Sequence, residues 1–284
     1  MTKPFLAMTT ALWLTAGLWA QQTPKQPAPK SQKEVEALMA IQNPPECAPP
    51  SPLPECPDAR IKAADDLVHN FKDTEFKEFA YQMKTLSYQQ KNEYEAMLVA
   101  GEQTLEINPD NIVVLITLAQ AIPQRTKEFD LDKEEKLQKA EKLAKKAQTL
   151  VPNLAKFNPQ ITDEEWAGYK KSAMSQVHEA LGMAAFVRKN YPAAEQAFKA
   201  SVDVSPQPDP TTLYRLAMVY NAQNKYDEAI AALDKAIAAG GLKVGDKDLA
   251  AEQKAAIMKA KESASKPAAP PASAPAPQVE IKRP

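Results

Sequence analysis

The sequence has little glycine, little cysteine and almost no histidine. Its 284 residues include seven Gly, two Cys and two His. Loops that bind phosphates or dinucleotides are built from clustered glycines, and the chain has no such cluster and no Gly-x-Ser-x-Gly segment. Two His leave little material for a metal site or for imidazole catalysis. These shortages argue against the common nucleotide-binding, metal-dependent and serine-nucleophile enzymes, and we expect neither a cofactor nor a metal.

An excess of charge of either sign is also missing. Lys and Arg together number 35 against 36 Asp and Glu, which gives a formal net charge of −1. Proteins that bind nucleic acids usually carry a clear basic excess or a basic stripe, because phosphate neutralisation supplies much of their affinity. We therefore expect no nucleic-acid partner.

Long hydrophobic runs are limited to the first 20 residues. Lys3 gives a short positive start, and Phe5 to Ala20 is an uncharged run followed at once by Gln and Pro. A membrane-spanning helix needs about 20 apolar residues, so this shorter run is typical of a signal peptide cleaved near Ala20. A retained N-terminal anchor is the alternative. Cleavage would leave a periplasmic or secreted protein with no stable membrane span.

Proline is abundant but unevenly placed, which divides the rest of the chain. Ten of the 25 Pro lie in residues 21–57 and six in 267–284. The stretch between them is rich in Ala, Lys, Glu, Gln and Leu, a composition typical of helices. We expect an all-α protein with three parts after the leader. They are a Pro-rich segment at 21–57 containing one helix at 31–43, a helical repeat domain at 58–262 that ends in a capping helix, and a disordered tail at 263–284.

The only two cysteines are Cys47 and Cys56, which flank a Pro-rich segment. In an oxidising compartment, such a near-neighbour pair is most simply a disulfide. Free thiols are the main alternative, and a metal or redox role has less support because no His lies nearby and no Cys-x-x-Cys pair exists. The disulfide would close a small loop outside the helical domain.

A short phrase recurs three times in the middle of the chain. The copies begin at Asn92, Lys189 and Asn224, and each carries a Tyr two positions later. Each continues as a run with small and apolar residues at helical spacing. The first two runs end before Pro109 and Pro206. Repetition of one helical unit predicts a stack in which each unit buries the face of the next.

The spacing within these units resembles the tetratricopeptide repeat, whose helix pair follows W-x2-L-G-x2-Y, then A-x3-F, then P. One copy runs through His178, Leu181, Gly182, Ala194, Phe198 and Pro206, and the next through Leu213, Leu216, Ala217, Tyr220, Ala229 and Leu233. The resemblance implies a right-handed α-solenoid of helix pairs. The phrase at 70–76 is similar to segments of envelope assembly repeat proteins, which fits an exported member of the family.

Irregular spacing between the units locates two insertions. About nine extra residues fall in 123–132 and about 20 in 153–172, relative to a 34-residue repeat.

Helix starts are marked by Asp209 before Pro210, and by Thr162 and Asp132, each followed three residues later by Glu. A final polar-faced helix is expected at 246–262 to cover the end of the stack.

A search for catalytic groups gives only weak candidates. His178 is followed by Glu179, but a zinc-binding helix would need a second His at the position of Gly182. His178 also occupies the repeat's usual Trp position, so we interpret it as a packed or groove-edge residue. His69 is expected on a solvated helix face, and the acidic run 163–165 as a helix start. No catalytic residue is therefore assigned.

The resemblance also implies a binding surface, the concave groove formed by the first helix of each pair. Its outward positions, by matching to the family, are Gln82, Gln89, Gln120, Glu179, Phe186, Tyr214 and Asn221. Amide and aromatic groups suit an extended or helical peptide, although a merely solvated surface is the alternative. Glu179 and Met183 do not match the Lys and Asn of the family's chaperone-tail clamp, which argues against recognition of a C-terminal carboxylate.

These features together predict a non-enzymatic scaffold that binds a protein or peptide partner in the cell envelope. Two alternatives stay open: an accessory subunit of an envelope enzyme or assembly complex, and a self-associating structural protein. The partner itself is not identified by the sequence.

Overall fold

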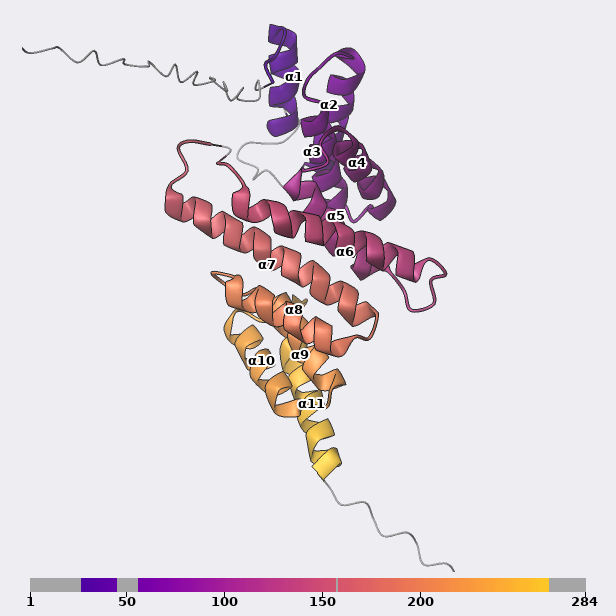
Figure 1. Cartoon of the computed structure of the whole chain (residues 1–284), viewed down its shortest axis with the longest axis vertical. Helices are drawn as coiled ribbons and strands as arrows, with labels where there is room; N and C mark the ends of the chain where they lie inside the picture. The colour runs from indigo at the N-terminus through magenta and orange to yellow at the C-terminus, as the bar shows by residue number, and fades with distance from the viewer. Residues whose placement is uncertain (1–26, 45–55, 157, 266–284) are drawn as a thin grey trace, which may run out of the picture.

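The computed structural model describes residues 27–44, 56–156 and 158–265 (Figure 1). The predicted signal peptide, Cys47 with its predicted bond to Cys56, and nearly all of the predicted tail lie outside these residues. The described part contains α1 (Gln32–Gln42), α2 (Pro57–Asn70), α3 (Lys77–Gln90), α4 (Tyr94–Ile107), α5 (Ile112–Arg125), α6 (Lys133–Leu150), the 3₁₀ turn η1 (Val151–Asn153), α7 (Asp163–Val187), α8 (Tyr191–Val204), α9 (Pro210–Ala222), α10 (Tyr226–Ala238), β1 (Lys243–Val244), β2 (Lys247–Asp248) and α11 (Leu249–Ser265).

The helices form an elongated stack in which neighbours in sequence are neighbours in space (Figure 1). Four pairs, α3–α4, α5–α6, α7–α8 and α9–α10, follow one another along the long axis, with α1 and α2 at one end and α11 at the other. Each pair contacts the next, so the hydrophobic core runs along the stack as a series of clusters. The predicted all-α solenoid of helix pairs is confirmed.

The recurring phrase forms the same turn in three of the pairs. Asn92, Lys189 and Asn224 each adopt a left-handed backbone conformation, with φ of 62°, 63° and 59°. The amide after each donates across the turn to a carbonyl five residues earlier, at 2.9 Å in all three cases. This 6→1 bond satisfies a carbonyl that the helix end would leave unpaired. Asn tolerates this conformation better than most residues, so the phrase marks the sharp turn between the two helices of a pair.

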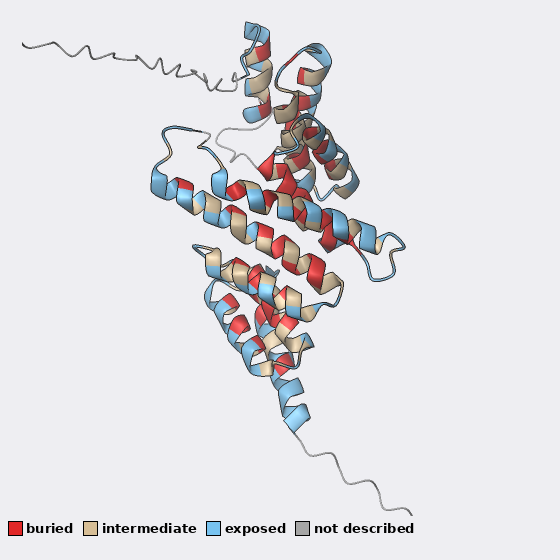
Figure 2. Cartoon of the chain, viewed as in Figure 1, coloured by how far each residue is buried: buried red, intermediate tan, exposed pale blue. Residues whose placement is uncertain are grey.

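Small residues lie where paired helices cross, as predicted. Gly182 of α7 is buried, and a Cβ atom added there would stand 2.8 Å from the ring of Phe198 in α8. Ala217 of α9 is fully buried in the cluster that contains Ala229 and Leu233 of α10. Close backbone approach lets the large side chains fill the space beside the crossing. Figure 2 shows buried residues gathered on the faces that the helices turn toward one another.

The helix starts follow the sequence only in part. Thr162 forms the predicted capping box with Glu165 at the start of α7, and Asp209 caps α9, with Pro210 at its first position. Asp132 precedes α6 but makes no capping bond. Its carboxylate is 2.9 Å from Lys136 Nζ, so an ion pair replaces the cap. The first insertion forms the exposed turn at 126–132. The second forms the connection from η1 to α7 and the additional first turns of α7, which has 25 residues.

The final helix begins later than predicted. Residues 243–248 form a short antiparallel hairpin, with Lys243 paired to Asp248, and α11 runs from Leu249 to Ser265 rather than over 246–262. The Asp248 carboxylate accepts hydrogen bonds from the amides of Leu242 and Ala250, which fixes the hairpin against the helix start. Ile257 packs on α10 while the last turns of α11 are exposed (Figure 2). No helix among the described residues is long and apolar enough to cross a membrane.

Candidate partner-binding groove

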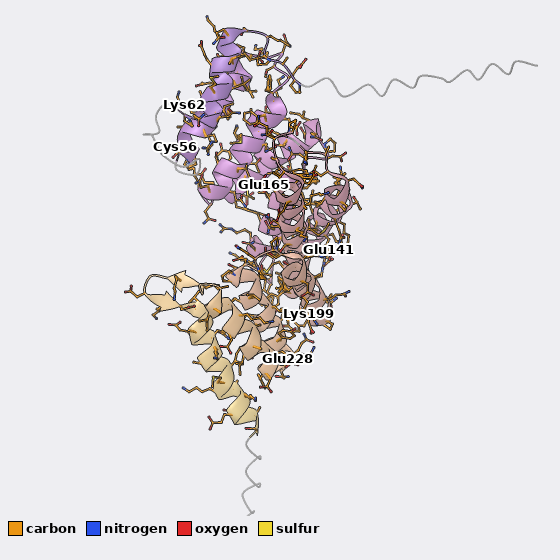
Figure 3. All side chains as sticks on the ribbon, turned by 90° about the vertical axis from the view of Figure 1, so that its left-hand side faces the viewer. Cys56, Lys62, Glu141, Glu165, Lys199 and Glu228 are labelled. Atoms are coloured by element: carbon orange, nitrogen blue, oxygen red, sulfur yellow. The ribbon has the colours of Figure 1, made fainter. Side chains whose placement is uncertain are left out.

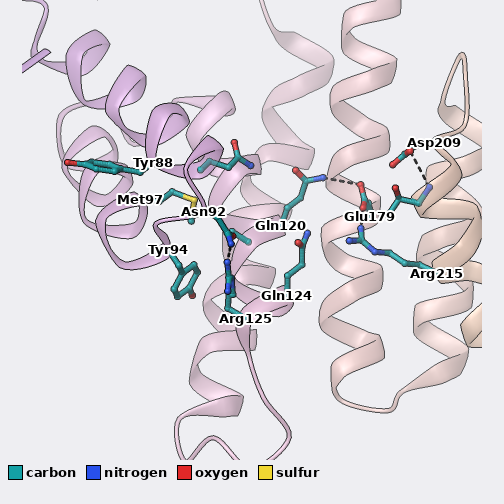
Figure 4. A pocket seen from close by; sticks show the side chains of 13 residues that line it. Tyr88, Asn92, Tyr94, Met97, Gln120, Gln124, Arg125, Glu179, Asp209 and Arg215 are labelled. Carbon is teal, nitrogen blue, oxygen red and sulfur yellow. Dashed lines mark hydrogen bonds and ion pairs between the residues drawn. The ribbon is translucent and has the colours of Figure 1, made fainter. Parts of the chain in front are cut away.

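A cavity of about 370 Å³ opens on the inner face of the stack (Figure 4). It is lined by side chains from α3, α5, α7 and α9, the first helices of the four pairs. The turn between α3 and α4 and the first turn of α4 complete the lining. The lining residues are Tyr88, Gln89, Asn92, Tyr94, Met97, Gln120, Ala121, Gln124, Arg125, Glu179, Asp209, Thr211 and Arg215. The cavity therefore spans four consecutive pairs.

A chain of polar contacts crosses the middle of this cavity. Gln120 Nε2 of α5 donates to Glu179 Oε2 of α7 at 3.0 Å, and the other oxygen of Glu179 is ion-paired with Arg215 of α9 (Figure 4). Glu179 is buried. Burial lowers the pKa of the Arg215 guanidinium, but arginine stays charged in proteins. The three side chains tie three first helices together, and each charge is neutralised by the other.

A second cavity of about 370 Å³ adjoins the first and shares Gln120, Glu179 and Asp209 with it. Its other lining residues are small or amide-bearing, Ser172, Ser175, Gln176, Ser205, Gln207 and Thr212. The two cavities form one groove along the first helices, which we call the inner groove. Hydroxyl and amide groups of this kind can both donate to and accept from a peptide backbone.

The opposite end of the inner groove is aromatic and positively charged. Tyr88, Tyr94 and Met97 surround Asn92, whose side-chain oxygen accepts a hydrogen bond from Arg125 Nη2 (Figure 4). Burial raises the pKa of the Tyr94 phenol, so this group stays neutral near pH 7. An apolar wall beside a fixed cation is suited to a side chain that has both an apolar and an acidic part.

The structure brings together only some of the residues predicted for the groove. Gln89, Gln120 and Glu179 line the first cavity. Gln82 lies farther along α3 and accepts a hydrogen bond from Asn111 at 2.7 Å. The other three line neither cavity. Phe186 packs against a core cluster of α7, α8 and α9, and Tyr214 against one of α9, α10 and α11, while Asn221 is half-buried near the end of α9.

Several groove residues escaped the sequence reasoning because they belong to turns and helix ends. Asn92 and Tyr94 are part of the recurring phrase, which the sequence identifies only as a turn signal. Arg125 is the last residue of α5, beside an insertion, and Asp209 is identifiable from the sequence only as a helix start. Such residues have no fixed place in the helical pattern, so periodicity could not assign them to the inner face.

No catalytic constellation appears in the part of the chain that the structure describes. His178 is half-buried on α7, and burial lowers its pKa, so the imidazole is neutral near pH 7. Asp163 and Glu165 are occupied by an ion pair with Lys156 and by the capping box. Across residues 27–44, 56–156 and 158–265, no group of three His, Cys, Asp or Glu could hold a metal ion.

The outer side of the stack is formed by the second helix of each pair and carries both acidic and basic side chains. Glu141 of α6 and Lys199 of α8 both lie toward the right-hand side of the view in Figure 3. Glu141 is ion-paired with Arg188, and Lys199 is exposed. These residues belong to no described cavity of the inner groove, so the outer side offers positions for control substitutions.

Comparison with known proteins finds a family match in one part of the chain. Residues 186–241 match the family model described as tetratricopeptide repeat. A search of curated proteins finds no match. Among solved structures, the chain is similar to a thermophilic TPR protein of Thermus thermophilus, with 16% identity, a TM-score of 0.49, and coverage of 72% of this chain and 91% of that one. It is also similar to the TPR domain of P58(IPK), with 10% identity, a TM-score of 0.29, and coverage of 81% and 65%.

Proteins built from this repeat are generally non-catalytic interaction modules, and the fold suggests a protein–protein interaction scaffold. The match at 186–241 covers the region in which α8, α9 and α10 follow the repeat pattern closely. The family match therefore identifies tetratricopeptide repeat sequence at residues 186–241 of this chain.

Proposed function

We propose that this protein is a non-enzymatic scaffold of the cell envelope that binds a protein or peptide partner in the inner groove. The observation that carries the proposal is the first cavity itself. Four first helices converge on one concave site that combines aromatic, amide and charged side chains. Binding sites of this kind use a few anchored aromatic or Arg side chains for affinity and polar groups for orientation.

The envelope location is a separate part of the proposal and is supported only by the sequence of residues 1–20. A short uncharged run after a positive start is typical of an exported protein. Intact-mass measurement of protein isolated from its native cells should give a chain that begins at Gln21 or close to it. A chain that retains Met1 and needs detergent for extraction would contradict cleavage of the signal peptide and would leave the groove proposal unchanged.

Site-directed photo-crosslinking in native cells tests partner binding directly. A photoreactive phenylalanine analogue at Gln124, which is exposed and lines the first cavity, should capture a partner protein after irradiation. The matched control places the same group at Lys199, an exposed residue of α8. Capture from Gln124 but not from Lys199 supports the inner groove. Capture from Lys199 alone would move the partner site to the outer side.

One observation favours a second candidate function, self-association. In the turn at 126–132, Phe129 is 90% exposed and Leu131 is fully exposed. The turn is held in shape by Asp130, which accepts from the Lys127 amide at 3.1 Å and binds Lys136 at 3.1 Å. Large apolar side chains held in water often mark an interaction surface. Light scattering should then give a molar mass that is a multiple of the monomer mass, and the double variant Phe129→Ser, Leu131→Ser should return it to the monomer mass. A wild-type protein that stays monomeric at high concentration would reject this candidate.

A further inference from the structure

The inner groove contains two charges that have no ion partner among the residues that the structure describes. Four charged residues line the first cavity: Arg125, Glu179, Asp209 and Arg215. Glu179 and Arg215 neutralise each other. Among the described residues, no carboxylate lies within 4.0 Å of Arg125 and no cation within 4.0 Å of Asp209. One positive and one negative group are therefore left facing the same cavity, and they come from different helices, α5 and α9.

Arg125 retains most of its hydrogen-bonding capacity. A guanidinium has five N–H donors, and within the described part of the chain the only side-chain hydrogen bond of Arg125 goes from Nη2 to Asn92 Oδ1. Its partner is a neutral amide, so the positive charge is oriented but not neutralised. Tyr94 and Met97 line the cavity beside it. A carboxylate arriving at this end would gain charge-assisted hydrogen bonds, which are stronger than neutral ones.

Asp209 retains one free oxygen. Its Oδ1 accepts the capping bond from the Thr211 amide at 3.1 Å, while Oδ2 makes no hydrogen bond or ion pair to the residues that the structure describes. Asp209 lines both cavities, so this oxygen lies at the junction of the two halves of the groove. An ammonium or guanidinium group is the ligand that a free carboxylate oxygen in such a groove would bind best.

We propose that the inner groove recognises a peptide segment that carries both an acidic and a basic side chain, with the acid bound at Arg125 and the base at Asp209. The inference rests on the proposed function, because it names the class of partner for the same groove. Gln89, Gln120 and Gln124 lie along the same cavity and can bond the backbone between the two charged side chains. The two opposite charges fix the direction of the segment, since a reversed peptide would place like charges together.

The test uses the full chain and a synthetic library of random heptapeptides with acetylated N-termini and amidated C-termini. Two variants remove one charge each: Arg125→Gln and Asp209→Asn. Asn caps helices as well as Asp, so α9 should stay intact.

The wild type should enrich peptides with both an acidic and a basic residue at fixed spacing. Arg125→Gln should lose the acidic preference and Asp209→Asn the basic one, each with about five- to tenfold weaker binding of the best peptide. Lys199→Gln, an outer-side charge removal, should change neither preference.

The outcomes separate this inference from the function on which it rests. Enriched peptides without charge preference would overturn the inference and leave groove binding in place. Enrichment only in a parallel library with free ends would show that chain termini, rather than side chains, supply the charges, and would also overturn it. A wild type that binds no peptide in either library, together with no photo-capture from Gln124, would reject both the inference and the proposed function.

Discussion

The two halves of the repeat stack share one architecture of paired helices but differ in how closely they follow the repeat sequence pattern. The C-terminal half, α7 to α10, contains the residues that match the family model. The N-terminal half, α3 to α6, has the same left-handed turn at Asn92 and a glycine at a tight contact, where Gly101 faces Leu118. The architecture is shared, but the N-terminal half follows the sequence pattern less closely.

The difference shows where the site lies. Nine of the thirteen residues that line the first cavity come from the N-terminal half, and only Glu179, Asp209, Thr211 and Arg215 from the other. The regular half keeps small and apolar residues at the crossings, while the less regular half adds amides, tyrosines and Arg125 on the inner face. Local departures from a structural pattern are expected at functional sites, and here they coincide with the cavity.

The largest effect should come from the crossing of α7 and α8. Phe198 is fully buried and fills the space beside Gly182. Phe198→Ala should therefore lower the free energy of unfolding by about 3–5 kcal/mol, measured by urea unfolding followed by circular dichroism. Lys199→Ala, the exposed neighbour, is the control and should change it little. Similar midpoints for the two variants would show that this crossing is not the packed centre of the regular half.

A second pair of substitutions compares the two glycines directly. Gly182→Leu should cost about 1–3 kcal/mol because the new side chain meets the rigid ring of Phe198. At Gly101 the nearest atoms are the ends of the Leu118 side chain, 2.8 and 2.9 Å from an added Cβ. Leu can change its rotamer, so Gly101→Ala should cost less than Gly182→Ala in the same assay. The opposite order would mean that the N-terminal half is packed more rigidly than the C-terminal half.

A third prediction concerns the ion pair between α7 and α9, to which Gln120 of the N-terminal half is hydrogen-bonded. Arg215→Met leaves the buried Glu179 carboxylate without its cation, which should lower the free energy of unfolding by about 1 kcal/mol or more. Adding Glu179→Gln should restore part of the loss, because the unpaired charge is removed. Additive losses in the double variant would show that the two side chains act independently.

The smallest expected effect is a pH-dependent loosening of α1. The Glu34 carboxylate is buried and accepts hydrogen bonds from Thr74 Oγ1 and from the Lys30 amide, both at 2.6 Å. The hydrogen bond from Thr74 is the main cause that lowers the pKa of Glu34. A lowered folded-state pKa means that the stabilisation is complete above the ordinary value near 4.5 and is lost as the pH falls below it. The protection factors of the α1 amides, corrected for the pH dependence of intrinsic exchange, should therefore fall on acidification, with less pH dependence in Glu34→Gln.

Much of the fold could be predicted because it depends on local patterns. The recurring phrase located three turns, and Thr162 and Asp209 marked real helix starts. Asp132 also directly precedes a helix, α6, but its carboxylate binds Lys136 and makes no capping hydrogen bond. The predicted start of the last helix was wrong because residues 243–248 form a hairpin, which helical periodicity in the sequence does not reveal.

The site was less predictable because it depends on contacts between distant residues. Matching to the family placed Gln120 and Glu179 on the inner face, but Arg215, the ion-pair partner of Glu179, is 36 residues away along the chain. Phe186 and Tyr214 were expected in the groove, yet neither lines a cavity of the inner groove, and each packs against a core cluster. A helix position near the edge of the groove can turn its side chain either way, and the neighbouring helix decides which.

The central claim is that the partner binds across both halves, in the first cavity. Hydrogen exchange of the full chain, with and without the protein captured from Gln124, tests it most directly. The account predicts that added protection is concentrated in the inner-groove segments, from Tyr88 to Met97, at the end of α5 near Arg125, and at the start of α9 near Asp209. Protection confined to α6, α8 and α10, with those segments unchanged, would contradict it.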